Sequence, residues 1–122
     1  MKDFRTLSVW QKSHELTILI YKQTSSFPRE ELFGLTSQIR RASSSIGANI
    51  AEGCGRNSDG DLSRFLQIAF GSANELDCHL LLARDLDLIE TGNYELLFEK
   101  LLEVKKMLGS LIRKVNGDRT SS

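Results

Sequence analysis

The chain has 122 residues, a length typical of one domain with a single hydrophobic core. Its 16 basic and 16 acidic residues cancel, so any contact with nucleic acid needs a local patch or one assembled from several subunits. The spacing of its two cysteines excludes a disulfide framework and a zinc knuckle, and the short apolar stretches exclude a signal peptide and a membrane span, which predicts a cytoplasmic protein.

Four segments carry the helical period of apolar residues, and each is bounded by glycine, proline or polar residues. The first helix is predicted over about residues 8–25 and ends before Pro28, where a short helical turn follows. The second is predicted over about 35–52. A glycine-rich loop separates it from the third, at about 60–88. The fourth, at about 94–115, has apolar residues that alternate three and four apart, as in a heptad seam.

Short connections between these helices predict an all-α fold, an antiparallel up-and-down four-helix bundle. The bundle is expected to form one domain over residues 1–116, followed by a flexible tail at 117–122. The second helix is rich in Ser, Ala and Gly, and Gly47 weakens it, so it is expected to be held by packing on more than one side. Ile18 and Leu96 lie off the core stripes of their helices, which indicates an interface between subunits.

Patterns that would indicate catalysis or metal binding are incomplete. Glu75 and His79 share a helix face, but the second such pair that a di-metal bundle requires is missing. The loop that begins at Gly53 follows a helix instead of a strand, and it fails as a dinucleotide fingerprint and as a calcium loop. No serine or histidine stands in a nucleophile–base arrangement. The sequence therefore predicts no enzyme, no cofactor, no metal and no small-molecule substrate.

One polar constellation remains on the second and third helices, where charged and amide side chains recur at spacings of three and four. One interpretation is a network between helices or subunits, formed by Gln38, Asn49, Glu52, Glu75 and Arg84. In this interpretation the nearby arginines also serve ion pairs. The other interpretation is a patch that contacts phosphate groups or a partner, formed by Arg40, Arg41, Arg56 and Arg64.

The last helix and the tail are locally basic, with a surplus of three positive charges over residues 99–119. A solvated helix face is one interpretation of this surplus. The alternative is a basic rim for RNA or an anionic partner, with Lys105, Lys106 and Arg113 as candidate contacts. No aromatic residues interleave with the lysines, which argues against a platform on which bases stack.

Two long segments resemble a bacterial family of small four-helix-bundle proteins of the ribosomal RNA intervening-sequence type. They are LTSQIRRASSSIGANIAEGCGR at 35–56 and FLQIAFGSANELDCHLLLARDL at 65–86, and the opening FRTLSVWQKSHELT also matches. The positions that carry the resemblance are Gln38, Arg40, Arg41, Asn49, Glu52, Gly53, Gly55, Arg56, Gly71, Asn74, Glu75, Leu82, Ala83 and Arg84. Gly47 stands where many members have proline.

This family is also similar to the accessory variability determinant of diversity-generating retroelements, which forms a five-fold barrel and is thought to bind nucleic acid and a reverse transcriptase. The resemblance therefore implies a homopentamer that handles nucleic acid, although the retroelement protein is more basic than this chain. Together, the residues and the resemblance predict a non-enzymatic homo-oligomeric adaptor that binds RNA or an RNA-handling protein. A protein-only structural scaffold without nucleic-acid binding is the alternative.

Overall fold

The computed structural model describes residues 2–121 of the chain, with side chains described through residue 117. In this part of the chain, all regular secondary structure is helical, and loops connect the helices. The four long helices are α1 (Ser8–Thr24), α2 (Ser37–Cys54), α3 (Asp59–Asp85) and α4 (Thr91–Ser121). Three short turns complete the chain: η1 (Phe4–Thr6), η2 (Arg29–Glu31) and the π-helical η3 (Leu32–Thr36).

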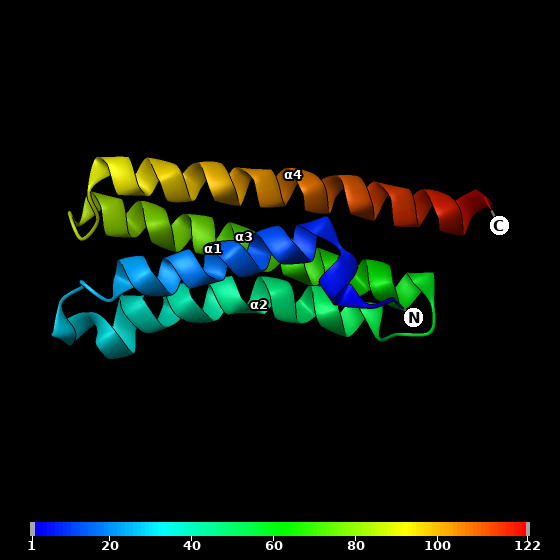
Figure 1. Cartoon of the computed structure of the whole chain (residues 1–122), viewed down its shortest axis with the longest axis horizontal. Coiled ribbons are helices and arrows are strands. Elements are labelled where there is room, and N and C mark those ends of the chain that lie inside the picture. The colour runs from blue at the N-terminus through cyan, green and yellow to red at the C-terminus, as the bar shows by residue number, and fades with distance from the viewer. Residues whose placement is uncertain (1, 122) are drawn as a thin grey trace.

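The four helices pack as a bundle in which each helix contacts the two beside it. α1 packs on α2 and α4, and α3 packs on the same two helices from the other side. Successive helices run in opposite directions along the long axis in Figure 1, and α4 reaches past the others at its C-terminal end. The predicted all-α four-helix bundle is therefore confirmed.

The core is formed by the apolar stripes that the sequence indicates. On α2, Ile39, Ile46 and Ile50 are completely buried, because positions three and four apart share one helix face. The heptad seam of α4 is buried from Tyr94 to Val104 and onward to Leu108. None of the helices in residues 2–121 combines the length and the apolar character that crossing a membrane requires.

The ends of α2 and α3 differ by a few residues from the predicted ends. α2 begins at Ser37, after a kink at Gly34 (φ −112°, ψ −111°) that interrupts the helical path. α3 begins at Asp59, because the Ser58 hydroxyl accepts a hydrogen bond from the Asp61 amide and caps the first turn. It ends at Asp85, just before Asp87, which has a positive φ of 59°.

α4 differs most from its prediction, since it begins at Thr91 and continues to Ser121. The predicted end near residue 115 is therefore too early. The backbone of residues 117–121 belongs to the helix, and Ser122 lies outside the described residues. The flexibility expected of the tail at 117–122 stays a prediction.

The small residues of α2 bring two neighbouring helices close to it. A Cβ atom added at Gly47 would lie 3.3 Å from Nε1 of Trp10 on α1. A Cβ atom added at Gly53 would lie 3.0 Å from Cβ of Phe65 on α3. α2 is therefore packed on two sides within the monomer, so its small residues are accounted for before any contact with another subunit.

Candidate functional site

Part of the predicted polar network forms hydrogen bonds between α2 and α3. The Arg41 guanidinium donates hydrogen bonds to Oε1 of Gln38, at 2.6 Å, and to Oε2 of Glu75, at 2.8 Å. Gln38 is one helical turn before Arg41, while Glu75 lies on the facing helix. This triad therefore ties α2 to α3, although both charged side chains stay more than one-third exposed.

The remaining members of the predicted network contact other residues. Asn49 donates to the Ser45 carbonyl oxygen, and Glu52 accepts a hydrogen bond from Arg56 at 2.9 Å. Arg84 pairs with its neighbour Asp85, and its guanidinium also lies over the Tyr94 ring at the start of α4. Of the predicted network, Gln38 and Glu75 are brought together through Arg41, which was predicted as a phosphate contact. Asn49 and Glu52 bond to other residues.

Two of the candidate phosphate-binding arginines converge on one aromatic ring. The guanidinium carbons of Arg56 and Arg64 lie 4.8 and 4.5 Å from the ring centre of Phe65. Each arginine also has a carboxylate nearby, since Arg56 pairs with Glu52 and Arg64 Nε lies 3.9 Å from Asp61. Much of the positive charge at this end of α2 and α3 is therefore balanced within the monomer.

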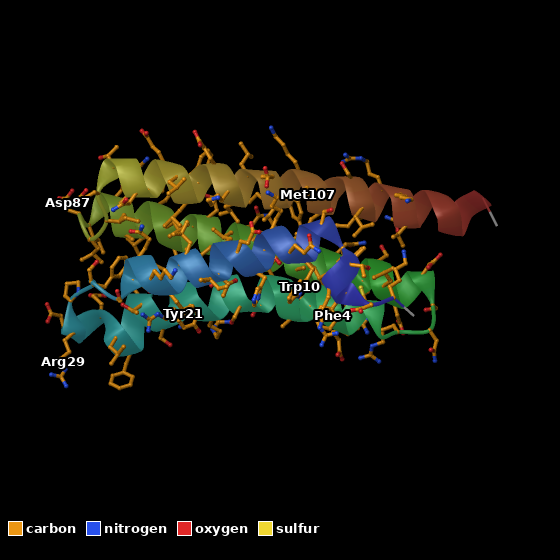
Figure 2. The ribbon with its side chains drawn as sticks, viewed as in Figure 1. Phe4, Trp10, Tyr21, Arg29, Asp87 and Met107 are labelled. Atoms are coloured by element: carbon orange, nitrogen blue, oxygen red, sulfur yellow. The ribbon has the colours of Figure 1, made fainter. Side chains whose placement is uncertain are left out.

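Arg40 points to the other side of α2, toward α1. Its Nε donates to the Thr24 hydroxyl at 2.9 Å, and its Nη2 donates to the Tyr21 carbonyl oxygen at 3.3 Å. Its guanidinium carbon also lies 4.8 Å from the ring centre of Tyr21, which Figure 2 labels on α1. Among the described residues, Arg40 has no carboxylate within ion-pair distance.

The three candidate contacts on α4 differ in whether their charge is paired with a carboxylate. Lys105 donates to Asp77 on α3 at 2.6 Å, and both side chains are less than one-quarter exposed. Arg113 reaches the hydroxyl of Ser110 at 3.3 Å, and Lys106 has no ion pair in the described part of the chain. Lys105 is therefore a helix–helix contact, while Lys106 and Arg113 keep their charge available to a partner.

An aromatic cluster near the start of the chain was not predicted from the sequence. The rings of Trp10 and His14 stack with centres 4.7 Å apart, and Phe4 meets Trp10 edge to face at 4.9 Å. Arg5 lies over the Phe4 ring, and Figure 2 shows Phe4 and Trp10 side by side near the N-terminus. The i, i+4 spacing of Trp10 and His14 was the available signal, since such residues meet on a helix.

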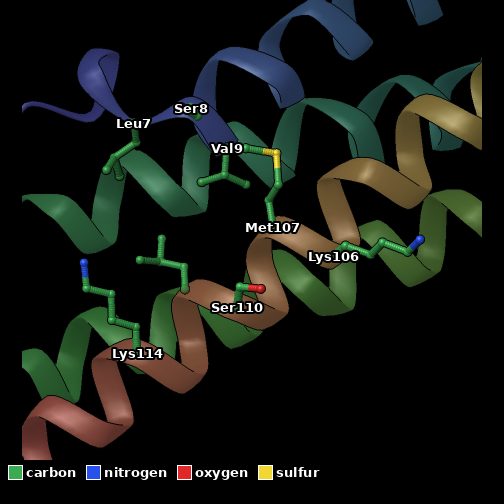
Figure 3. A pocket seen from close by; sticks show the side chains of 8 residues that line it. Leu7, Ser8, Val9, Lys106, Met107, Ser110 and Lys114 are labelled. Carbon is green, nitrogen blue, oxygen red and sulfur yellow. The ribbon is translucent and has the colours of Figure 1, made fainter.

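A largely apolar groove of about 430 Å³ runs between the start of α1 and the C-terminal half of α4. Figure 3 shows Val9 and Met107 facing each other across it, with Lys106 and Lys114 at its edge. The groove exists because α1 begins at Ser8, whereas α4 continues past that point. Sequence periodicity gave no sign of it, because a groove depends on where one helix starts relative to another.

The cysteine and histidine side chains are dispersed. Burial raises the pKa of the Cys54 thiol, with the nearby Lys2 acting in the opposite direction, whereas Cys78 is exposed. His79 Nε2 is buried without a hydrogen-bond partner and lies 3.6 Å from Oε2 of Glu75, beyond hydrogen-bonding distance. In the described part of the chain, no three His, Cys, Asp or Glu side chains are placed to hold one metal ion.

Large apolar side chains remain on the outside of the bundle. Ile18 and Leu96 are 45% and 41% exposed, as their positions off the core stripes predicted. Leu82 on α3 and Leu86, the residue that follows this helix, are each about half exposed. Exposed apolar faces of this kind typically mark contacts with other proteins.

Comparisons with known proteins agree with this fold. A crystal structure of a protein of unknown function from the S23 ribosomal protein family of Bacteroides thetaiotaomicron is similar to the chain, with 33% identity and a TM-score of 0.80. The match covers 86% of this chain and 95% of that one. None of the curated proteins is significantly similar to this sequence. The predicted similarity to retroelement determinants stays a prediction. Residues 5–110 match the 23S rRNA-intervening sequence protein model, and the chain therefore belongs to that family.

Proposed function

We propose that the protein is a homo-oligomeric helical-bundle adaptor that contacts RNA or an RNA-handling protein. The observation that carries the proposal is the amount of apolar surface that one bundle leaves uncovered. In the described residues, eleven large hydrophobic side chains are more than one-third exposed, and they lie on α1, α3 and α4, in the turns after α1 and just after α3. Association with further copies of the same chain would bury this apolar surface while removing few polar groups from water.

The contact with RNA would use charges that the monomer leaves unpaired. Lys106 and Arg113 on α4 are exposed, and neither pairs with a carboxylate in the described part of the chain. Phosphate groups are the partners that such arginines and lysines prefer. The pentameric state and the nucleic-acid role follow the resemblance of the motifs, and the family description names ribosomal RNA intervening sequences. A cytoplasmic location would accompany this role.

Light scattering coupled to size exclusion tests the assembly. We expect an oligomer at micromolar concentration, and we expect Leu82→Glu to shift it toward the monomer because a buried charge is costly at an apolar interface. Asn74→Glu is the matched control, since Asn74 is an exposed polar position on the same helix. A wild-type protein that elutes as a clean monomer at micromolar concentration would contradict the assembly.

RNA filter binding across a salt series tests the second half of the proposal. We expect the affinity for RNA to fall steeply as the salt concentration rises. The dependence on salt should be shallower for a Lys106→Gln, Arg113→Gln double variant than for the wild type, because binding of the variant releases fewer counterions. Arg56→Gln is the control, because Arg56 is engaged by Glu52. Retention that is absent even at low salt would contradict RNA binding.

A protein-only scaffold is the second candidate function. It is favoured by the internal pairing of the charged residues that the sequence singled out. Arg41 pairs with Glu75, Arg56 pairs with Glu52, and Lys105 pairs with Asp77. An oligomer in light scattering that binds no RNA at low salt would favour this scaffold over the adaptor.

A further inference from the structure

A polar pocket lies at the end of the bundle where the chain passes from α1 to α2. Its volume is about 370 Å³, which is within the range of sites for small molecules. The C-terminal turn of α1, the connection around Pro28 and the π-helical turn η3 form its walls. Figure 2 labels Arg29 at this end of the molecule, opposite the end that carries Phe4.

Two arginines contribute positive charge to the lining of this pocket. Arg29 and Arg40 both line it, and no carboxylate is among the described residues that do so. Neither guanidinium has an ion-pair partner in the described part of the chain. Arg40 is also partly buried and held in place by Thr24 and the Tyr21 carbonyl oxygen. The pocket is therefore prepared for an anion.

Thr36 also lines this pocket, and its buried hydroxyl group has no hydrogen-bond partner. Thr36 is only 3% exposed, and its Oγ1 makes no hydrogen bond. Thr36 immediately precedes α2, yet its side chain does not cap the helix. Buried polar atoms are almost always paired, so an orphaned hydroxyl in a pocket indicates a missing partner. An oxygen-rich ligand would supply that partner.

Part of the pocket wall is apolar. Phe27 is nearly buried, and Pro28 and Leu32 present carbon atoms beside it. A simple anion would leave these carbon atoms without a contact. A ligand with an anionic head and an organic body would contact both the polar and the apolar lining residues, as ligands of small-molecule sites commonly do.

We propose that this pocket binds a phosphate monoester. The phosphate would accept hydrogen bonds from Arg29, Arg40 and the Thr36 hydroxyl, and the organic group would pack against Phe27, Pro28 and Leu32. A phosphate monoester carries close to two negative charges near neutral pH, which matches the two arginines, whereas a carboxylate carries one. The arginine fork also fits phosphate oxygens in pairs. This binding does not depend on RNA binding along α4.

Amide chemical shifts measured by NMR on the full chain at low salt test the proposal, with adenosine 5′-monophosphate, inorganic phosphate and adenosine as probes. We expect saturable shifts confined to residues 24–40, with the monophosphate binding more tightly than inorganic phosphate and adenosine not binding. Inorganic phosphate that binds as tightly as the monophosphate would overturn the role of the apolar wall. The whole proposal fails if no probe gives saturable shifts at concentrations up to about 10 mM, because a specific site would have a dissociation constant below that concentration.

Matched variants separate this pocket from general electrostatic attraction. Arg29→Gln should weaken monophosphate binding about tenfold, the effect of one charge-assisted hydrogen bond, without affecting the fold because Arg29 is exposed. Thr36→Val should also weaken binding, while the stability of the unliganded protein should not fall, because the hydroxyl has no partner to lose. Arg5→Gln, an exposed arginine at the opposite end, is the control. A loss of affinity in Arg5→Gln equal to that in Arg29→Gln would overturn the assignment.

Discussion

The close approach of α2 and α3 at Gly53 provides a sharp test of how tightly the bundle is packed. A Cβ atom added at Gly53 would lie 3.0 Å from Cβ of Phe65 and 3.1 Å from Cδ1 of Leu62. The Cβ of Phe65 is fixed to its helix backbone and has no rotamer that moves it away. Gly53→Ala therefore requires the two helices to separate by a few tenths of an ångström.

The size of the effect follows from two opposing contributions. Alanine is favoured over glycine inside a helix by at most about 1 kcal/mol, and less near a helix end such as this one. Overpacking of a close contact costs typically about 1–3 kcal/mol. Gly53 does not have positive φ, so the backbone itself would accept alanine. We expect Gly53→Ala to lower the free energy of unfolding by up to about 2 kcal/mol.

Urea unfolding followed by circular dichroism at 222 nm measures this change. Gly71→Ala is the matched control, because Gly71 lies within α3 and a Cβ atom there would have no neighbour within 4 Å. The control should gain up to about 1 kcal/mol from helix propensity alone. If Gly53→Ala gains stability as Gly71→Ala does, then α2 and α3 are not packed as closely as the structure indicates.

Three further predictions concern side chains that are buried to different degrees. A thiol reagent should label Cys78 rapidly and Cys54 only as the protein unfolds, because Cys54 is buried with a raised pKa. Asp77→Asn should lower the free energy of unfolding by about 1–3 kcal/mol, because it leaves the little-exposed Lys105 without its carboxylate. Desolvation raises the pKa of Tyr94 above 10.0, so stability should decline as pH rises through that value, and less steeply in Tyr94→Phe.

Each of these predictions has a clear contrary result. Equal labelling of both thiols in the native protein would show that the end of α2 opens readily. Asp77→Asn should also cost more than Glu75→Gln, whose partner Arg41 is over one-half exposed, and the reverse order would contradict the burial argument. For Tyr94, the unfolded chain ionises first as pH rises, so an alkaline gain in stability would contradict the sign of its pKa shift.

Part of the candidate site was visible in the sequence because it lies on single helices. The spacing of Gln38 and Arg41 placed them on one face of α2, and the structure joins them by a hydrogen bond. The same reasoning placed Asn49 and Glu52 on that face, but Asn49 bonds within α2 and Glu52 bonds to Arg56 in the loop that follows α2. Spacing tells which side chains share a face, and it does not tell which of them reach a neighbouring helix.

The pairs that tie helices together needed the tertiary structure. Arg41 and Glu75 lie 34 residues apart, and Lys105 and Asp77 lie 28 apart. Whether such residues meet depends on the rotation of each helix about its axis and on the axial offset between helices, which local periodicity does not define. The pocket around Thr36 arises in the same way, because it lies between segments whose approach is set by the kink at Gly34.

The sequence by itself determined four amphipathic helices, their buried stripes and the exposure of Ile18 and Leu96. It did so because the helical period decides locally which face of each helix is apolar. Only the tertiary structure decided that α2 is packed closely by both neighbours, and that α4 extends beyond the start of α1 and leaves a groove there. It also decided that Lys105 pairs with Asp77 at a little-exposed position, while Lys106 has no ion pair among the described residues. These features depend on distances between helices, which result from the packing of all four side by side.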